Sequence, residues 1–485
     1  MKTVSNHPKW ALIHKKPGME LRLIKGHYYL YEVSSKWNKE KKRAQKITGK
    51  ILGKITEKEG FIPSRSKFID QIEFKNLSVK TCGVGSFCET VLQDVFAALK
   101  KHFGKEGEAI YCASLMRLSH QAPLKNMDLH FKHDFLSESF PHLSLSDKKM
   151  TALLRDLGES REKINAFFKE FFKKGEHILV DMTAIHSVSK EMDLNQRGYN
   201  SKGNSDPQVN LLLLFSESQQ EPAYYRLLPG HVRDVKSVKL SLKESGIDDA
   251  IFIADKGFYS KSNIDELEQL KLQYLIPLKR NHSLIDYTPF QKAGKEGLNH
   301  YFKFQERYIF CTVTTHQSGQ TLYTFLDDKL KLVEEESYLN RIETSKEEEL
   351  SIQDFYQKSC IFGTFALLTN ITGKTPSDIY ELYKSRMDIE TAFDAFKNTL
   401  QADRTYMQND QAMEGWMFIN YLALLAYWRM LKLLFGKGLL SKFSIHDLLI
   451  HLSHIKKIKI NGEWDLAEVT DKTKKLFAKL GYNIT

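Results

Sequence analysis

The feature that most constrains the fold is a run of short apolar segments between residues 176 and 281. The first three follow one another with only polar or turn-forming residues between them, which predicts an antiparallel meander. Each of the last two follows a segment with helical spacing. The segments occur in the order strand, strand, strand, helix, strand, helix, strand, at 176–187, 207–217, 222–230, 235–246, 249–260, 260–270 and 272–280. This order predicts a mixed α/β sheet.

The rest of the chain differs from this segment in its sequence patterns. We predict six parts: a basic β-rich DNA-binding module (1–85), a helical domain (86–175), the first part of the α/β core (176–281), a β-rich insertion (282–360), the second part of the core (361–435) and a C-terminal module (436–485) with a hairpin at Asn461-Gly462. Within the insertion we predict strands at 301–316, 320–333 and 359–370. The stretch 327–349 holds nine acids against four bases, which predicts solvated loops.

The net charge of +11 is concentrated near the start of the chain. Residues 1–60 hold 15 lysines and arginines against five glutamates. A concentrated basic segment indicates nucleic acid or an anionic surface as a partner. Two alternating, strand-like segments flank the run SSKWNKEKKRA. We therefore predict a hairpin loop whose Lys41, Lys42 and Arg43 contact DNA phosphates, although a solvated lysine-rich segment would have the same composition.

Cysteine usage and hydropathy indicate the compartment. The five cysteines are odd in number and form no CxxC pair, which predicts a reducing compartment, no disulfide framework and no zinc site. Basic residues precede any apolar run, so we expect no signal peptide. The apolar run 417–431 is interrupted by Asn420 and Arg429, and its length predicts a buried helix and no membrane span. We expect a cytoplasmic protein.

Residues 380–400 predict a single helix, begun by Ser377 as N-cap after Pro376. Four polar residues share one edge of this helix, because at about 100° per residue they lie within about 60° of one another. They are Tyr383, Arg386, Glu390 and Lys397. A glutamate between cations is by itself typical of a solvated helix face.

Two aspartates strengthen the case that this glutamate is functional. Asp181 and Asp255 each end an apolar strand, and in some meander sheets the first and fourth strands are neighbours. A helix after the last strand can then place Glu390 beside them. Three converging carboxylates would bind Mg²⁺ or Mn²⁺, and two such ions clamp both oxygens of a phosphoryl displacement. Each acid alone is more often a cap or a turn residue; the combination favours a site.

These residues resemble the DDE transposases of bacterial insertion sequences, in the group marked by a Y-x2-R-x3-E-x6-K helix. Residues 383–397 match every position of that motif. The second-acid motif, a strand followed by D-x-G-[FY], is matched by Asp255-Lys256-Gly257-Phe258. The resemblance covers about 176–435, and the N-terminal HYYLYEVSSKW resembles a subgroup less specifically.

The resemblance implies a ribonuclease-H-like catalytic core, interrupted by the insertion, that binds terminal inverted repeats and cleaves them with two Mg²⁺ or Mn²⁺ ions. The freed 3′-hydroxyl ends then attack target DNA, within a dimer assembled on two DNA ends. It implies that Asp181, Asp255 and Glu390 bind the metals. It also implies a set of residues that contact double-stranded DNA, namely Tyr383, Arg386, Lys397 and Lys256.

One departure from the family pattern concerns the insertion. Hairpin-forming relatives stack a flipped base on an inserted tryptophan, whereas residues 282–360 contain none. An aromatic face of another kind can stack a base. The candidates are Tyr301, Phe302, Tyr308 and Phe310.

Two alternatives stay open at this level. A metal-dependent DNA nuclease would share the same carboxylates but would not join DNA. A domesticated transposase that only binds DNA would share the basic module, although an intact acid trio argues against it.

Overall fold

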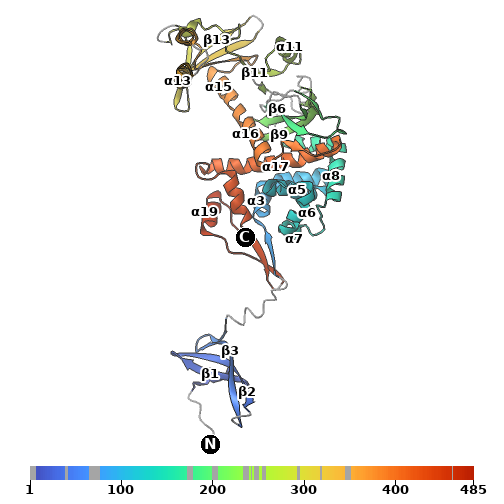
Figure 1. Cartoon of the computed structure of the whole chain (residues 1–485), viewed down its shortest axis with the longest axis vertical. Coiled ribbons are helices and arrows are strands. Elements are labelled where there is room, and N and C mark those ends of the chain that lie inside the picture. Colours follow the sequence, from blue (N-terminus) through green and yellow to red (C-terminus); the bar gives the residue numbers. More distant parts are fainter. Residues whose placement is uncertain are drawn as a thin grey trace. The chain divides into compact units, whose positions relative to one another are not determined.

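The computed structural model describes residues 7–38, 42–64, 77–171, 178–198, 206–232, 240–241, 243–244, 251–253, 258–291, 295–316, 319–344, 351–460 and 462–484. The chain forms two compact units (Figure 1). Unit 1 comprises Met1–Lys80 and Lys456–Glu468, and unit 2 comprises Thr81–Ile455 and Val469–Thr485. The six-part division of the sequence stays a prediction.

Unit 1 contains an antiparallel sheet with the strand order β1-β2-β3-β4 and a short helix, α1 (Lys9–Leu12). The strands are β1 (Met19–Ile24), β2 (His27–Asn38), β3 (Arg43–Thr56) and β4 (Gly60–Pro63). Lys25 and Gly26 join β1 to β2, both with positive φ, as a tight two-residue hairpin turn demands. The buried core is small and consists of Ala11, Leu21, Leu30, Leu52 and Ile55. The predicted pair of strands is confirmed, but the loop between them is shorter than predicted, because β2 extends to Asn38 and β3 begins at Arg43.

A second small sheet in unit 1 has the order β18-β17-β5. Its strands are β5 (Ser78–Thr81), β17 (Lys456–Ile460) and β18 (Glu463–Leu466). Ile460 pairs with Glu463 across a two-residue connection, and Gly462 has a φ of 92°. The predicted hairpin is therefore confirmed, although Asn461 lies outside the described residues.

The helical part of unit 2 confirms the helical pattern of residues 86–172. Its helices are α3 (Gly83–Val91), α4 (Gln93–Phe103), α5 (Glu106–His120), α6 (Leu124–His133), α7 (Leu136–Ser139), α8 (Asp147–Glu159) and α9 (Arg161–Lys169). Two further helices follow late in the chain, α18 (Ile445–Ser453) and α19 (Asp471–Leu480).

The long helix α17 (Asp410–Gly436) packs against α5 and α8 (Figure 1). A Cβ at Gly415 would lie 2.2 Å from the carbonyl oxygen of Leu154, and a Cβ at Gly158 would lie 2.1 Å from that of Gln411. The two glycines therefore let the α8 and α17 backbones touch. With 27 residues, α17 is longer than the predicted run and long enough to cross a membrane, but 67% of its most apolar window is buried in the structure. It is a core helix, as predicted.

The predicted meander forms a sheet with the order β16-β6-β8-β7, and β9 pairs with β8. The strands are β6 (Ile178–Ser187), β7 (Gln196–Arg197), β8 (Pro207–Ser216), β9 (Glu221–Pro229) and β16 (Arg404–Thr405). Strands β6, β8 and β9 are antiparallel, and β16 runs parallel to β6. Helix α17 packs on β9, so a helix from much later in the sequence covers part of the meander.

A six-stranded sheet has the order β10-β11-β15-β14-β13-β12. Its strands are β10 (Ile251–Ile253), β11 (Gln273–Leu278), β12 (His300–Phe304), β13 (Arg307–Thr315), β14 (Thr321–Asp327) and β15 (Thr364–Thr369). β10 and β11 are parallel, joined through α11 (Lys261–Gln269), and the other pairs are antiparallel. β10 also lies against β6. The mixed α/β class is confirmed, but the predicted single sheet is wrong, because β6, β8 and β9 lie in one sheet and β10 and β11 in another. Of the predicted helix 235–246, only 240–241 and 243–244 are described.

The insertion contains more helix than predicted. The strand expected at 320–333 ends at Asp327, and α13 (Asp328–Thr344) replaces most of the predicted acidic loop. The cause is a cap, because Asp327 Oδ1 accepts the backbone N–H groups of Lys329 at 3.0 Å and Leu330 at 3.2 Å. Two short helices, α12 (Thr288–Gln291) and α14 (Ile352–Lys358), complete the insertion.

Candidate active site

The helix predicted at 380–400 begins earlier and is interrupted. α15 (Pro376–Lys384) starts with Thr375 as N-cap and Pro376 in the first turn, so the prediction of Ser377 as N-cap was wrong. Thr375 Oγ1 accepts the N–H of Asp378 at 3.2 Å, and Asp378 Oδ2 accepts that of Thr375 at 2.8 Å, which completes a capping box. The hydrogen bonds that the Asp378 carboxylate accepts from the backbone N–H and the hydroxyl of Thr375 lower the pKa of Asp378.

Beyond α15 the chain is not one regular helix. α16 (Arg386–Asp394) begins after Ser385, and η3 (Ala395–Thr399) is a π-helical turn. A π turn holds more residues than an α turn, and such turns are frequent at functional sites. The four motif residues therefore do not share one straight stripe: Tyr383 lies on α15, Arg386 and Glu390 on α16, and Lys397 on η3.

The structure brings Asp181, Arg386 and Glu390 together. Arg386 Nη1 lies 2.7 Å from Glu390 Oε1, and Arg386 Nη2 lies 3.6 Å from Asp181 Oδ2. The side chains of Arg386 and Asp181 are 15% and 18% exposed, whereas that of Glu390 is 53% exposed. Helix α16 packs against β6, which explains how two residues over 200 positions apart approach one guanidinium.

Asp181 and Arg386 differ in the hydrogen bonds that hold their side chains. Asp181 Oδ1 accepts the backbone N–H of Met182 at 2.8 Å, which fixes the carboxylate at the middle of β6. Arg386 Nε is buried and has no hydrogen-bond partner among the residues that the structure describes. A buried donor without a partner costs about 1–3 kcal/mol. The guanidinium is thus held through its two terminal nitrogens, and its Nε–H makes no hydrogen bond to the described residues.

Asp255 and Lys256 lie outside the described residues, so their predicted roles stay predictions. The strand before them, β10, ends at Ile253. This strand lies against β6, which carries Asp181.

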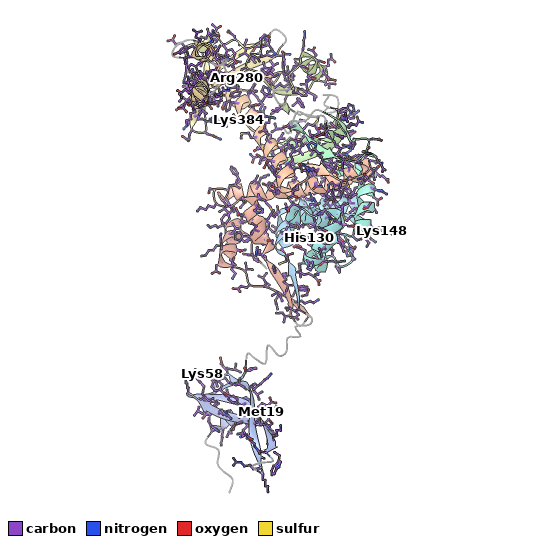
Figure 2. The ribbon with its side chains drawn as sticks, in the orientation of Figure 1. Met19, Lys58, His130, Lys148, Arg280 and Lys384 are labelled. Carbon is purple, nitrogen blue, oxygen red and sulfur yellow. The ribbon has the colours of Figure 1, made fainter. Side chains whose placement is uncertain are left out.

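The other two motif residues lie at the edges of this cluster. The Tyr383 ring stacks on Phe365 of β15, with centroids 5.9 Å apart, and is half-buried. Lys397 is half-buried in the π turn. Next to Tyr383, Lys384 Nζ lies over the Phe365 and Tyr380 rings at 5.5 and 5.2 Å, and burial lowers its pKa (Figure 2).

Sequence reasoning missed a residue that ties the end of this helical segment to the core. Arg117 of α5 is 3% exposed, donates from Nη2 to the carbonyl of Leu400, and donates from Nε to Asn420 Oδ1 at 2.9 Å. Its guanidinium lies 4.8 Å from the Trp416 ring. Burial lowers the pKa of Arg117 to about 10. No local signal could reveal this contact, because the partners lie about three hundred residues along the chain.

The donor set suits a hard cation. Within the described residues no group of three His, Cys, Asp or Glu side chains is placed to hold a metal ion, and Asp255 lies outside them. Asp181 and Glu390 nevertheless both approach the Arg386 guanidinium, at 3.6 and 2.7 Å. Carboxylate oxygens are the ligands that Mg²⁺ and Mn²⁺ prefer.

The four aromatic candidates of the insertion differ in exposure. Tyr301 and Tyr308 are 72% and 59% exposed. Phe302 packs against Phe325 and Tyr380, and Lys295 Nζ lies 3.9 Å from the Phe310 ring. Tyr301 and Tyr308 are therefore the candidates with a ring surface open to a base. Arg280, labelled in Figure 2, connects the end of β11 to β15 and α13. It donates to the Thr364 carbonyl at 2.7 Å and to Glu334 at 2.7 Å.

The predicted phosphate-binding residues lie at the end of the β2–β3 hairpin. Lys42 and Arg43 are exposed, and Lys41 lies outside the described residues. Lys42 has a positive φ of 42° in the connection between the strands.

Comparison with known proteins adds the following. The family described as "Transposase DDE domain" matches residues 172–426, more than half of the chain, and the match spans Asp181, Asp255 and Glu390. A cryo-EM structure of a piggyBac transposase synaptic complex with hairpin DNA matches with a TM-score of 0.38 and 12% sequence identity, over 72% of this chain and 70% of that chain. No curated protein matches the sequence.

Proposed function

The chain belongs to the DDE transposases and is an enzyme that acts on DNA, and from this premise we propose its specific reaction. It binds the terminal inverted repeats of a bacterial insertion sequence, cleaves them, and transfers the 3′-hydroxyl ends to target DNA. The observation that carries the proposal is the position of Asp181 and Glu390 on either side of Arg386.

The catalytic core in this proposal is ribonuclease-H-like. The antiparallel strands β6, β8 and β9, with β10 against β6 and β11 parallel to β10, support it. The first and fourth core strands, β6 and β10, lie against each other although they belong to different sheets. The insertion between β11 and β15 extends the far edge of the sheet.

Asp181, Asp255 and Glu390 would hold two Mg²⁺ or Mn²⁺ ions, which supply charge neutralisation and an activated oxygen for phosphoryl transfer. Arg386 neutralises Asp181 and Glu390 in the structure, and with Tyr383 it would hold a phosphate beside the scissile bond. A guanidinium suits this role because it offers planar, paired donors to an anion. Lys397 and Lys256 would contact the DNA backbone, and Lys41, Lys42 and Arg43 would contact phosphates further away.

Double-stranded DNA is the partner in this proposal, both as transposon ends and as target, and the active assembly is a homodimer on two DNA ends. The protein acts in the bacterial cytoplasm, on the nucleoid when bound. A hairpin route would need an aromatic acceptor for a flipped base, and the exposure of Tyr301 and Tyr308 makes these the residues to test.

The test is a joining assay. The protein is incubated with Mg²⁺, a duplex from the flank of its own gene and a supercoiled plasmid. Duplex ends joined to the plasmid support the transposase, and nicked or cut duplex with no joined product supports the nuclease. Binding with no cleavage in Mg²⁺ or Mn²⁺ supports a domesticated binding protein and overturns the proposal.

A further inference from the structure

The β2–β3 hairpin continues beyond the small core of unit 1 as a two-stranded ribbon, residues 33–38 paired with 43–48. Every residue of β3 from 43 to 50 is exposed. A strand with one packed face would alternate between buried and exposed residues. Both faces of the ribbon therefore meet solvent, and an isolated two-stranded hairpin is marginally stable in water. No described residue of the ribbon belongs to the buried core of unit 1, which indicates a surface for a partner.

The strand register assigns the side chains to two faces. Residues directly opposite in an antiparallel pair point to the same side, and neighbours along a strand point to opposite sides. One face carries Trp37 opposite Ala44, and Ser35 opposite Lys46. Lys46 and Arg22 both pair with Glu20 of β1, and their hydrogen bonds lower the pKa of that carboxyl. This face is thus joined to the body of the unit and partly neutralised by its own acid.

The opposite face has a different composition, and we call it the reading face. Lys36 and Asn38 of β2 lie across from Gln45 and Arg43 of β3, and Ser34 lies across from Ile47. Asn38 Nδ2 donates to Gln45 Oε1 at 3.2 Å, which confirms that the two amides share this side. Ile47 is 44% exposed. Among the described residues of this face there is no acid.

These side chains are of the types that distinguish bases. Arginine and lysine donate to guanine, asparagine and glutamine form paired hydrogen bonds with adenine, and apolar atoms contact the methyl group of thymine. Asparagine and glutamine can also donate to phosphates, but a phosphate contact gives no reason for an exposed isoleucine to share a face with Lys36 and Arg43.

The ribbon also has the dimensions and the charge for a groove. Strands about 4.8 Å apart fit a major groove about 12 Å wide, which admits a two-stranded ribbon. In the sequence, residues 33–50 hold seven lysines and arginines against one glutamate. The excess positive charge suits the phosphates on both walls of the groove.

We propose that this ribbon enters the major groove of the transposon-end DNA with its reading face toward the bases, and that Asn38, Gln45, Arg43 and Lys36 select the terminal sequence. The inference rests on the proposed function, because it takes end DNA as the ligand. It adds the element, the groove and the residues that supply sequence specificity.

The experiment measures binding of the full-length protein to two labelled duplexes by fluorescence anisotropy, with EDTA to prevent cleavage. One duplex carries the inverted repeat from the flank of the gene, and the other has the same bases in shuffled order. The test variant Asn38→Ala/Gln45→Ala changes no charge. The matched control, Ser35→Ala/Thr48→Ala, removes two polar groups from the opposite face.

We expect the test variant to lose about 10-fold or more in affinity for the repeat, and to keep its affinity for the shuffled duplex and its salt dependence. The control variant keeps the wild-type preference. Methylation of guanine N7, which lies in the major groove, should weaken binding of the repeat by the wild-type protein.

Two results overturn the inference while end recognition stands: a wild-type preference retained in Asn38→Ala/Gln45→Ala, or binding that is insensitive to N7 methylation. A wild-type protein that binds both duplexes equally overturns end recognition itself, and with it this inference. Circular dichroism of both variants confirms that the exposed substitutions leave the fold intact.

Discussion

The active site and the ribbon both meet DNA in our proposals, yet they are built in opposite ways. At the active site Asp181, Arg386 and Glu390 come from segments over 200 residues apart, and two of the three are largely buried. In the ribbon, all of the proposed reading residues lie within 34–47 and are exposed or half-exposed. Phosphoryl transfer requires charges fixed within a fraction of an ångström, whereas groove recognition requires an accessible surface. Substitutions should therefore affect chemistry in one region and binding in the other.

The largest effect should follow neutralisation of the catalytic acids. Asp181→Asn, Asp255→Asn or Glu390→Gln should each lower the cleavage rate by about 10³-fold or more, because the cation site loses a charged ligand. Binding of end DNA should be unchanged. Gel assays of cleavage and anisotropy of binding measure the two quantities.

Glu381→Gln, an exposed acid on α15, is the matched control and should cleave at the wild-type rate. Normal cleavage by any one of the three acid variants would falsify its assignment as a metal ligand.

The second effect tests whether the distant core positions the catalytic helix. Arg117→Met leaves the Leu400 carbonyl and the Asn420 side chain without their donor, at a cost of about 3 kcal/mol in the free energy of unfolding. The cleavage rate should fall as well, since η3 loses its anchor. Urea unfolding and cleavage assays below the transition measure both. The exposed Arg155→Met on α8 should change stability by about 0.5 kcal/mol or less. If Arg117→Met matches that control, Arg117 is not an anchor.

The third effect belongs to the ribbon. Lys41→Ala/Lys42→Ala, which spares the reading face, should weaken binding to repeat and shuffled DNA alike and lower the slope of log affinity against log salt by about two. Cleavage at saturating protein should stay normal. Lys58→Ala, in the β3–β4 turn of the same sheet, keeps the slope because Glu57 and Glu59 flank it (Figure 2). An unchanged slope in the double variant would show that the basic run is a solvated surface that does not contact DNA.

The smallest effect is a pH dependence of stability, and it arises from two histidines of unit 2 that belong to neither region. His120 and His130 stack in unit 2 with centroids 4.3 Å apart, and burial lowers the pKa of His120 to about 4. The unfolded chain, with a histidine pKa near 6.5, therefore binds a proton first, so stability is full above about pH 6.5 and falls toward pH 4. Between pH 7 and pH 5 this group should lower the free energy of unfolding by about 1–2 kcal/mol. His120→Gln should reduce that difference, and an equal difference in the variant would exclude His120 as its source.

Local patterns predicted much of the fold. Alternating apolar residues predicted the β6–β8–β9 meander, and helical spacing predicted the helices between 86 and 172. Two of the errors lie where a capping side chain set a boundary. Asp327 begins α13 inside the predicted acidic loop, and Thr375 displaces Ser377 as N-cap of α15. Caps depend on single hydrogen bonds, and a sequence offers several candidates for each.

The sequence by itself determined which residue types this protein brings to DNA: the acids beside apolar strand segments, the motif helix and the basic hairpin. These follow from spacing and composition, which are local. The sequence misplaced Asp181, which lies inside β6 and does not end it. Only the tertiary structure decided that Arg386 lies between Asp181 and Glu390, that a break at Ser385 and a π turn separate the motif residues, and that Arg117 holds the end of that segment. Such contacts join distant segments through packing of α16 on β6 and of α5 on α17. Their partners are fixed by the shared core, which no single window of sequence contains.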